Sequence, residues 1–262
     1  MELLNPTKIQ AELEQLKLVF VDESESTNTL AKELAKSKAH KLPWVVVADH
    51  QTAGRGQQGN IWWSDRGSLT FSIAMHAPKN CAPNLIALQV ANLIAVTIEQ
   101  HLPSIRVSLK WPNDLFLDDK KFGGILIESI QVDDQSVMII GIGLNVTCDL
   151  ELADAEFRNL ATSLNQYGDH PIDINILLSS ICNRIESVLS SSNMSPVQIT
   201  EDFLNRSLFP LGSELTIQLR DGAIVSGIFH NIGNDAELII KDDHQSIAIV
   251  SATVIDYQID KT

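Results

Sequence analysis

The sequence predicts an α+β fold, in which a domain built on a mixed sheet is followed by a small β-barrel. Three observations support this prediction. Apolar runs with strand character alternate with helical patterns over most of the chain, Asp-rich turns join neighbouring strands in its middle part, and short strands with polar turns follow Pro210. With 262 residues, 44% of them apolar, the chain is long enough for one main domain and a small second one.

The N-terminal part is expected to alternate helices and strands. A helix begins at about Pro6, since the first helical turn tolerates proline, and the run LVFVDE predicts a strand. Ser26 or Thr27 caps the next helix, so polar side chains stand where the preceding strand ends. Two strands, at 44–50 and 68–75, then flank a glycine-rich loop.

The rest of the chain is predicted to start with one long helix, from about Pro83 to Leu102. Strands, helices and turns then follow in three groups. These are strands at 106–111, 114–132 and 136–146, a helical segment at 173–207, and short strands separated by turns at 220–223, 232–237 and 241–245.

Charge and cysteine content bear on partners and location. The formal net charge of −14 and the pI near 4.8 argue against binding to nucleic acid or anionic lipid, because phosphate binding relies on clustered Lys and Arg. The N-terminus lacks a signal-peptide pattern and no long uninterrupted apolar stretch follows, so we expect a cytoplasmic protein. Cys81, Cys148 and Cys182 are far apart and in no CxxC pair, which indicates small buried thiols rather than a disulfide framework or a zinc site.

The stretch VVVADHQTAGRGQQGNIWWS carries Gly54, Gly56 and Gly59 at the spacing of a dinucleotide-binding loop. A Rossmann site would need a helix directly after the last glycine and an acidic residue about twenty positions further on. Here an aromatic segment, a turn and a strand follow, and residues 71–81 contain neither Asp nor Glu. The sequence therefore excludes this kind of cofactor site, and the lack of GxxxxGK[ST] excludes a P-loop.

A flexible surface turn is the simplest alternative for this loop. Its neighbours favour a binding role, because Gln51 precedes it, Arg55 lies within it, and Trp62 and Trp63 follow it. Glycines permit close backbone approach, arginine offers a planar cation for carboxylate or phosphate, and tryptophan offers a stacking face for a purine. Together these parts predict a loop that closes over an acyl or nucleotidyl anion.

Two further segments carry candidate residues. Lys110, Asn113 and Asp114 lie where one strand turns into the next, and Lys121 precedes a Gly-Gly pair that indicates close approach by a ligand. An ordinary hairpin with a solvated, charged turn is the alternative interpretation. The strand IIGIGLNV, taken alone, indicates a core strand whose small residues serve packing.

Taken in order, ESTNTLA, QTAGRGQQGNIWWS, KWPNDLFLDDKKFGGILIE and IGIGLNV resemble the successive motifs of the biotin protein ligases, the biotin-[acetyl-CoA-carboxylase] ligase family. The motifs cover roughly residues 18–165, and the tail from Pro210 is similar to the SH3-like module of that family. The resemblance implies a class II synthetase-like catalytic domain of the biotin/lipoate ligase type at residues 1–207 and an SH3-like β-barrel domain at 208–262.

The resemblance also implies a two-step reaction, in which biotin and MgATP give biotinyl-adenylate and pyrophosphate, and a carrier-protein lysine then displaces AMP. Arg55 and Lys121 are the expected catalytic residues, because positive charge offsets the repulsion between the biotin carboxylate and the α-phosphate. No metal ligand is assigned, and Mg²⁺ is expected to arrive with ATP. The residues expected to bind biotin are Ser26, Thr27, Asn28, Gln51, Gly54, Arg55, Gly56, Gln57, Lys121 and Gly124. The residues expected to bind the nucleotide are Trp62, Lys110, Asn113, Asp114 and Asn145.

The sequence departs from the family pattern at two places. Gln57 and Gln58 follow Gly56 where many members have a further basic residue, which predicts a looser grip on the adenylate. The tail lacks the arginine that often ends the SH3-like module, so no catalytic residue is expected there. The segment before Ser26 is too short for a three-helix DNA-binding unit and is not basic, which predicts a ligase that does not bind DNA.

The expected protein partner is a biotin carboxyl carrier protein, a subunit of acetyl-CoA carboxylase, and neither DNA nor a membrane is an expected partner. A monomer and a homodimer both fit the sequence. The nearest alternative function is a lipoate or octanoate protein ligase or transferase of the same fold, although such enzymes lack the GRG loop followed by tryptophan and the KWPND segment. A non-catalytic biotin- or nucleotide-binding regulator is the alternative from another class, but it would not need Arg55 and Lys121 together.

Overall fold

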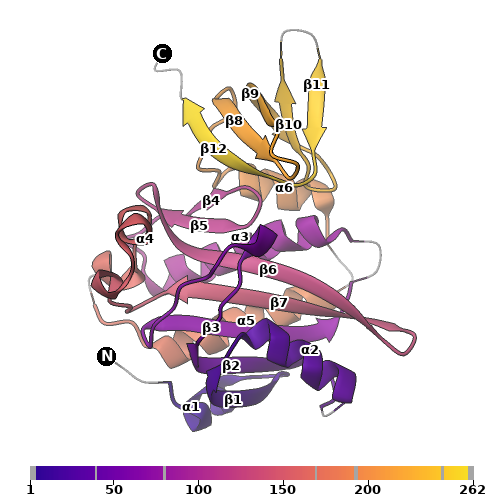
Figure 1. Ribbon diagram of the computed structural model, residues 1–262. Coiled ribbons are helices and arrows are strands. Elements are labelled where there is room, and N and C mark those ends of the chain that lie inside the picture. Colours follow the sequence, from indigo (N-terminus) through magenta and orange to yellow (C-terminus); the bar gives the residue numbers. More distant parts are fainter. Residues whose placement is uncertain are drawn as a thin grey trace.

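Two β-sheets form the framework of the molecule (Figure 1). A computed structural model describes residues 4–38, 40–78, 81–168, 170–191, 194–242 and 245–258 of the chain. The larger sheet has seven strands, in the order β1 (Lys17–Ser24), β2 (Trp44–Gln51), β3 (Ser68–His76), β7 (Gln135–Asn145), β6 (Lys120–Val132), β5 (Asp114–Leu117) and β4 (Ser108–Lys110). The smaller sheet has five strands, in the order β11 (Ser246–Ile249), β10 (Leu238–Lys241), β9 (Ile224–Ile232), β8 (Glu214–Leu219) and β12 (Ala252–Gln258).

The larger sheet is mixed, as predicted. Strands β1 and β2 run parallel, joined by the crossover through a helix, and every other neighbouring pair in this sheet is antiparallel. In the middle of the sheet, Gly143 is paired with Thr70 on one side and with Gly124 on the other, and Gly141 is paired in the same way with Ser72 and Leu126. Because paired residues point to the same face, this register gathers small side chains on one face of the sheet.

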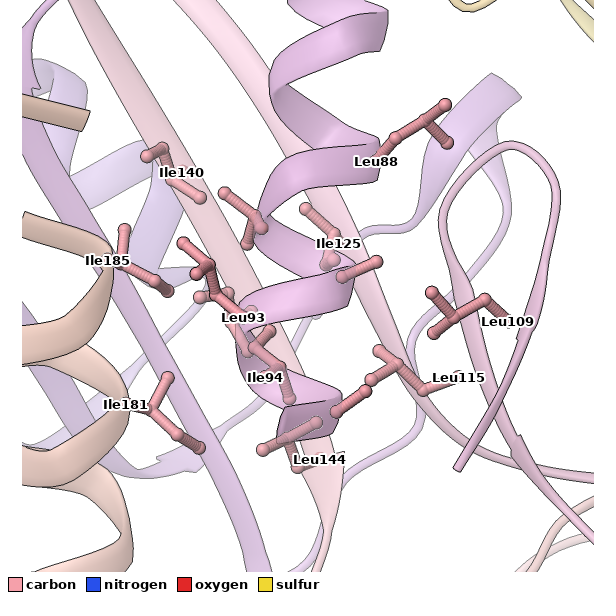
Figure 2. Close-up of a cluster of buried hydrophobic side chains, with 14 of the residues drawn as sticks. Leu88, Leu93, Ile94, Leu109, Leu115, Ile125, Ile140, Leu144, Ile181 and Ile185 are labelled. Carbon is pink, nitrogen blue, oxygen red and sulfur yellow. The ribbon is translucent and has the colours of Figure 1, made fainter. Parts of the chain in front are cut away.

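Helices cover both faces of the larger sheet. Helix α2 (Thr27–Ser37) packs on one face, against β2, β3, β6 and β7, and buries Ala31 and Ala35 beside Val46. The opposite face is covered by α3 (Pro83–His101) and α5 (Ile174–Ser190). Figure 2 shows this core, in which leucine and isoleucine side chains of α3 and α5 meet those of the sheet. The remaining helices are α1 (Pro6–Glu12), α4 (Ala155–Leu160) and α6 (Pro196–Leu204).

Each of the longer elements follows from its sequence. Helix α3 is apolar on nearly all sides because it is enclosed by the sheet, α5 and α6. Asp173 accepts hydrogen bonds from the backbone N–H groups of Asn175 and Ile176, and this N-cap explains where α5 begins. Ser26 occupies the N-cap position of α2, but its side chain makes no capping hydrogen bond. The sequence did not predict α4, which has only six residues.

The smaller sheet, orange to yellow in Figure 1, lies beside β4 and β5 at one end of the larger one. It is antiparallel throughout, which confirms the small β-rich module that the sequence predicts after Pro210. The link to the larger sheet is well bonded: Leu109 N–H donates to the Arg206 carbonyl at 2.8 Å, and the Arg206 guanidinium donates to Glu99 at 2.6 and 3.0 Å. In addition, Trp111 Nε1 donates to the Ala236 carbonyl at 2.9 Å. The Trp111 bond attaches the second sheet to the segment that carries Lys110 and Asn113, and the Arg206 bonds attach the chain just before that sheet to β4 and α3.

The described helices are all too short or too polar to span a lipid bilayer. Cys81, Cys148 and Cys182 are free thiols. The last two are buried, in agreement with their predicted packing role, and burial raises the pKa of Cys148 to about 11. Cys81 is only half-buried, which differs from the prediction.

Candidate active site

A cavity lies on the α2 face of the larger sheet, and its floor is made of very small residues. Gly141 and Gly143 on β7 and Gly124 on β6 line it. In β7, alternate residues face opposite sides, so the neighbours Ile140 and Ile142 enter the core while the two glycines face the cavity. The sequence predicted only packing for these two glycines, and they are site residues that it missed.

The floor has no room for larger side chains. A Cβ atom on Gly141 would lie 2.2 Å from Asn28 Oδ1, and one on Gly143 would lie 2.4 Å from the ring of Trp62. Both distances are far below van der Waals contact. The glycines therefore let Asn28 and Trp62 lie directly on the sheet.

One end of the cavity is lined by uncharged polar side chains. The first residues of α2 and the last residue of β2 meet there, because β1 and β2 are parallel and end at the same edge of the sheet. Gln51 Oε1 accepts hydrogen bonds from Thr27 N–H at 2.7 Å and Thr27 Oγ1 at 3.1 Å. Ser72 Oγ lies 2.7 Å from Thr27 Oγ1 and donates to Asn28 Oδ1 at 2.6 Å. This network is buried and holds the polar end in one geometry.

The glycine loop forms a small hairpin over the cavity. Trp62 N–H donates to the Gly54 carbonyl at 2.9 Å, and Gly56 N–H donates to the Asn60 carbonyl at 2.7 Å. A single 3₁₀ turn, Gln57–Gly59, forms the tip, so no helix follows the glycines and the exclusion of a Rossmann loop holds. Arg55 reaches back to α2, where Nη2 donates to Thr29 Oγ1 at 2.9 Å.

The opposite end of the cavity carries positive charge. Lys121 Nζ lies 2.6 Å from Asp114 Oδ1, and Lys110 lines the cavity beside this pair. Burial lowers the pKa of Lys110, with a smaller opposing effect from Asp114 and a further lowering by the positive charge of Lys121. Gly124 lies directly against the pair, since a Cβ there would be 3.6 Å from Lys121 Nζ. Two lysines and one carboxylate leave this end with a net positive charge suited to an anionic ligand.

Two buried polar atoms near the floor have no hydrogen-bond partner among the described residues. They are Trp62 Nε1 and Asn145 Oδ1. The Trp62 ring lies over Gly143 with its centre 5.9 Å from Lys121 Nζ, and Asn145 follows on the same face of β7. Asn145 Nδ2 is already used, because it donates to the Thr162 carbonyl at 3.1 Å. Unpaired buried polar groups are costly, so their presence indicates a place that a ligand completes.

The second sheet closes the cavity on one side. Ala252, Thr253 and Val254, at the start of β12, line it. The sequence predicted no site residue on this strand, and no motif in it signals the role. The other lining residues that were not predicted are Asn60, Ile61, Trp111, Pro112, Ile125, Leu126 and Ile142.

Of the predicted site residues, only Gly54 and Asn145 do not line the cavity. Gly54 lies beneath the Trp62 backbone, where a Cβ would be 2.6 Å from the carbonyl oxygen. Asn145 is buried at the end of β7. The cavity brings together the others: Ser26, Thr27, Asn28, Gln51, Arg55, Gly56, Gln57, Trp62, Lys110, Asn113, Asp114, Lys121 and Gly124.

Known proteins resemble this chain both in sequence and in fold. Residues 20–145 match the model of the Biotin/lipoate A/B protein ligase family. The chain is 31% identical to a biotin-[acetyl-CoA-carboxylase] ligase of Mycobacterium tuberculosis, over 91% of this chain and 88% of that protein. The chain belongs to the biotin protein ligase family.

Further comparisons agree with this membership. The ligase is 35% identical to the bifunctional ligase/repressor BirA of Bacillus spizizenii over 60% of this chain, a segment that spans 48% of that longer protein. Its fold matches a solved biotin protein ligase from Aquifex aeolicus in complex with biotin and ATP, with a TM-score of 0.75, 25% identity, and coverage of 92% of this chain and 97% of that one. The predicted fold class, and the preference for a biotin ligase over a lipoate enzyme, are confirmed.

The described residues of the ligase contain no group of three or more His, Cys, Asp and Glu side chains that could hold a metal ion. Asp114 is the carboxylate among the cavity-lining residues. Mg²⁺ commonly binds through one or two carboxylates, substrate phosphates and several waters. The residues present therefore fit an ion that enters with the triphosphate, with Asp114 beside it.

Proposed function

We propose that the cavity binds biotin and ATP side by side and joins them as biotinyl-adenylate, from which biotin passes to a lysine of a carrier protein. The chain is an ATP-dependent biotin protein ligase, and the single observation that carries the assignment of this cavity is the contrast between its two ends. A rigid, uncharged polar end faces a cationic end across a glycine floor. Biotin has the matching polarity, with a neutral ureido ring at one end and a carboxylate at the other.

The polar end suits the ureido ring. This ring has two N–H donors and one carbonyl acceptor, and all of them need partners once they are buried. Ser26, Thr27, Asn28 and Gln51 supply hydroxyl and amide groups there, and Ser26 has a hydroxyl that α2 does not use as a cap. We assign these four residues to the ureido ring, and the backbone of Gly54 and Gly56 with Gln57 and Gly124 to the rest of biotin.

The nucleotide is assigned to the region of Trp62 and Asn145. Adenine has an amino group that can donate to Asn145 Oδ1, which has no partner among the described residues, and a flat face for the Trp62 ring. Lys110, Asn113 and Asp114 then lie where the phosphates extend. Asn113 is held firmly, because its Nδ2 donates to the Ile125 carbonyl at 2.6 Å.

The chemistry depends on charge. A biotin carboxylate oxygen bonds to the α-phosphorus while the bond from phosphorus to the pyrophosphate oxygen breaks, so two anions must first approach. Lys121 and Arg55 are the proposed catalytic residues, because fixed cations placed where two anions must meet offset this repulsion. Asp114 holds the Lys121 ammonium at 2.6 Å and orients it. In the second step, the carrier lysine nitrogen bonds to the acyl carbon, AMP leaves with the C–O electron pair, and the amine releases its proton to solvent.

The glycine hairpin is proposed to protect the adenylate. It lies over the cavity, and its backbone is free of bulky groups at Gly54, Gly56 and Gly59. Closure of such a loop keeps water from the mixed anhydride. Arg55 is the loop's cation, since Gln57 and Gln58 follow it, and this supports a looser hold on the adenylate.

The partners and surroundings follow from the reaction. The carrier protein is the biotin acceptor, and an acetyl-CoA carboxylase subunit is the proposed carrier. We propose that the ligase does not bind DNA, given its net charge of −14, and that it acts in the cytoplasm, where ATP is available and free thiols persist. It acts as a monomer or a homodimer. We further propose that residues 1–207 are the catalytic domain and 208–262 the SH3-like domain.

The decisive experiment is ATP–pyrophosphate exchange by the purified protein with Mg²⁺, run with biotin, with lipoate and with neither acid. Exchange that depends on biotin, followed by biotin transfer to a purified carrier domain, is the expected result. Exchange with lipoate alone would move the protein to the lipoate branch of the fold. A failure to exchange with either acid would overturn the proposal.

A further inference from the structure

Glu128 lies beside the cavity, although neither the sequence patterns nor the cavity lining assigns it a role. It is on β6, and its carboxylate lies under the N-terminal half of α2 with 25% of the side chain exposed. A carboxylate in such a place is unfavourable unless it is paired. Its partners therefore show what it is for.

Both carboxylate oxygens of Glu128 are engaged. Oε1 pairs with Lys32 Nζ, and Oε2 accepts a hydrogen bond from Asn28 Nδ2 at 2.9 Å. The Arg55 guanidinium lies 3.8 Å from the same Oε2 atom. Burial by itself would raise the pKa of Glu128, but the hydrogen bonds from Lys32 and Asn28, with the charges of Lys32 and Arg55, outweigh it and lower the pKa. Glu128 is therefore a fixed negative charge between α2 and the glycine hairpin.

The contact with Asn28 sets the orientation of that amide. Asn28 Nδ2 has two hydrogens, and it donates to Glu128 Oε2 and to the Leu126 carbonyl, the latter at 3.2 Å. Its oxygen must then point the other way, towards Ser72 Oγ at 2.6 Å and over Gly141. An amide turned by half a rotation would place two oxygens against each other at Glu128. Glu128, together with the Leu126 carbonyl, thus orients Asn28 so that it presents an acceptor at the polar end.

The contact with Arg55 sets the base of the hairpin. Arg55 is 47% exposed and hydrogen-bonded to Thr29, so its neighbours on α2 and β6 hold it rather than the hairpin itself. Among the described ion pairs, Glu128 is the carboxylate that faces the Arg55 guanidinium, at 3.8 Å. One carboxylate consequently connects a residue of the polar end to the cation of the loop.

We propose that Glu128 is a positioning residue for biotin, which acts through Asn28 and Arg55 without touching the ligand. This inference rests on the proposed function of the cavity. Loss of the charge weakens the contacts that hold Asn28 and Arg55 in place, so biotin affinity falls. The described hydrogen bonds and ion pairs of Glu128 go to Asn28, Lys32 and Arg55 and not to Lys121, Trp62 or Asn145, so binding of ATP should be nearly unaffected.

The test compares Glu128→Gln with Glu33→Gln in the full-length protein. Gln keeps the shape and one acceptor but removes the charge, and Glu33 is an exposed carboxylate on α2, next in sequence to Lys32. In biotin-dependent ATP–pyrophosphate exchange, Glu128→Gln is expected to raise KM for biotin by about tenfold, as when a charge-assisted hydrogen bond is weakened, with KM for ATP and Tm nearly unchanged. Glu33→Gln should match the wild type, and Glu128→Asp should restore part of the affinity.

A second measurement separates positioning from folding. In an Asn28→Ala background, Glu128→Gln should raise KM for biotin less than in the wild type, because one of the two residues through which it acts is gone. An equal effect in both backgrounds, an unchanged KM for biotin, or a loss that tracks Tm and both KM values would each overturn the inference. If the wild type shows no biotin-dependent exchange, the proposed function is wrong and so is this inference. If the wild type is active and Glu128→Gln has the same KM for biotin as the wild type, only the inference is wrong.

Discussion

On strand β7, Ile140, Ile142 and Leu144 enter the core beneath the sheet, whereas Gly141, Gly143 and Asn145 lie on the face that carries the cavity. The first set fills space with large apolar side chains, two of which are labelled in Figure 2. The second set leaves space, so that Asn28 and Trp62 can approach the backbone. Alternation along one strand thus separates residues that fill the core from residues on the side of the cavity.

This separation teaches that changes on the two faces should have different readouts. Core-face changes should lower stability and leave the chemistry of the folded enzyme intact. Cavity-face changes should weaken binding or turnover and leave stability nearly unchanged. The predictions below test how complete the separation is.

The largest effect is expected from Lys121→Ala, on the cavity side. Removal of the cation that faces the reacting anions should slow adenylate formation by about a hundredfold to a thousandfold, comparable to the loss of one preorganised electrostatic contact. Because the side chain is 36% exposed, Tm should hardly change. Pre-steady-state adenylate formation measures the first effect and thermal denaturation the second. Lys120→Ala, at the exposed neighbouring position, is the control, and near wild-type adenylation by Lys121→Ala would remove Lys121 from the mechanism.

Ile140→Ala tests the core face. The side chain is fully buried in the core and does not line the cavity, so its truncation should lower the free energy of unfolding by about 2–5 kcal/mol. The exchange rate per folded molecule should remain close to that of the wild type. Urea denaturation measures the first quantity. Ile224→Ala deletes the same atoms from a side chain that is 62% exposed and should be nearly neutral. A collapse of turnover without loss of stability would show that the two faces are not separate.

Gly141→Ala tests the floor of the cavity. The added methyl group would lie 2.2 Å from Asn28 Oδ1, so Asn28 must move away from the polar end. We expect KM for biotin to rise about tenfold to a hundredfold, since displacements of about 1 Å have effects of this size. The same change in an Asn28→Ala background should add little. If biotin binds normally to Gly141→Ala, the floor is less tightly packed than the structure indicates.

The smallest effect concerns Gln57, at the tip of the hairpin. With excess biotin and ATP, the wild type should label lysines of bystander proteins, because the loop carries the single cation Arg55. Gln57→Arg adds a partly exposed charge worth about 0.2–1 kcal/mol, so adenylate release and bystander labelling should fall by about fivefold or less. Gln218→Arg, on the exposed face of β8, is the charge-matched control. Absence of bystander labelling by the wild type would contradict the looser hold.

Most of the fold was predictable because its elements are long and strongly patterned. Clear apolar patterns predict the strands at 44–50, 114–132 and 136–146 and the helix from Pro83, and the structure has strands and a helix in these segments. The short helix α4 was missed, since six residues carry too little periodic signal. Strands β1 and β2 pair in parallel, as their connection through helix α2 allows.

The cavity residues that lie in recognisable motifs were predictable from the sequence. Those whose position depends on the register of strand pairing were not. Arg55, Lys121 and the polar start of α2 stand out in the sequence. Gly141 and Gly143 did not, because which face a strand residue occupies depends on pairing with β3 and β6. The regular spacing of these glycines at alternate positions was the available signal. The wall from Ala252 to Val254 had none, since it depends on how the second sheet packs.

That wall makes the cavity a composite of two sheets, which has a practical meaning for protein engineering. Residues 4–191 supply the floor, the hairpin and the lysines, while β12 supplies the remaining side. The exposed turn at Leu211 and Gly212 joins the two parts. A chain cut at this turn yields two fragments, neither of which contains a complete cavity, and labelling would then report when fused partners bring the fragments together.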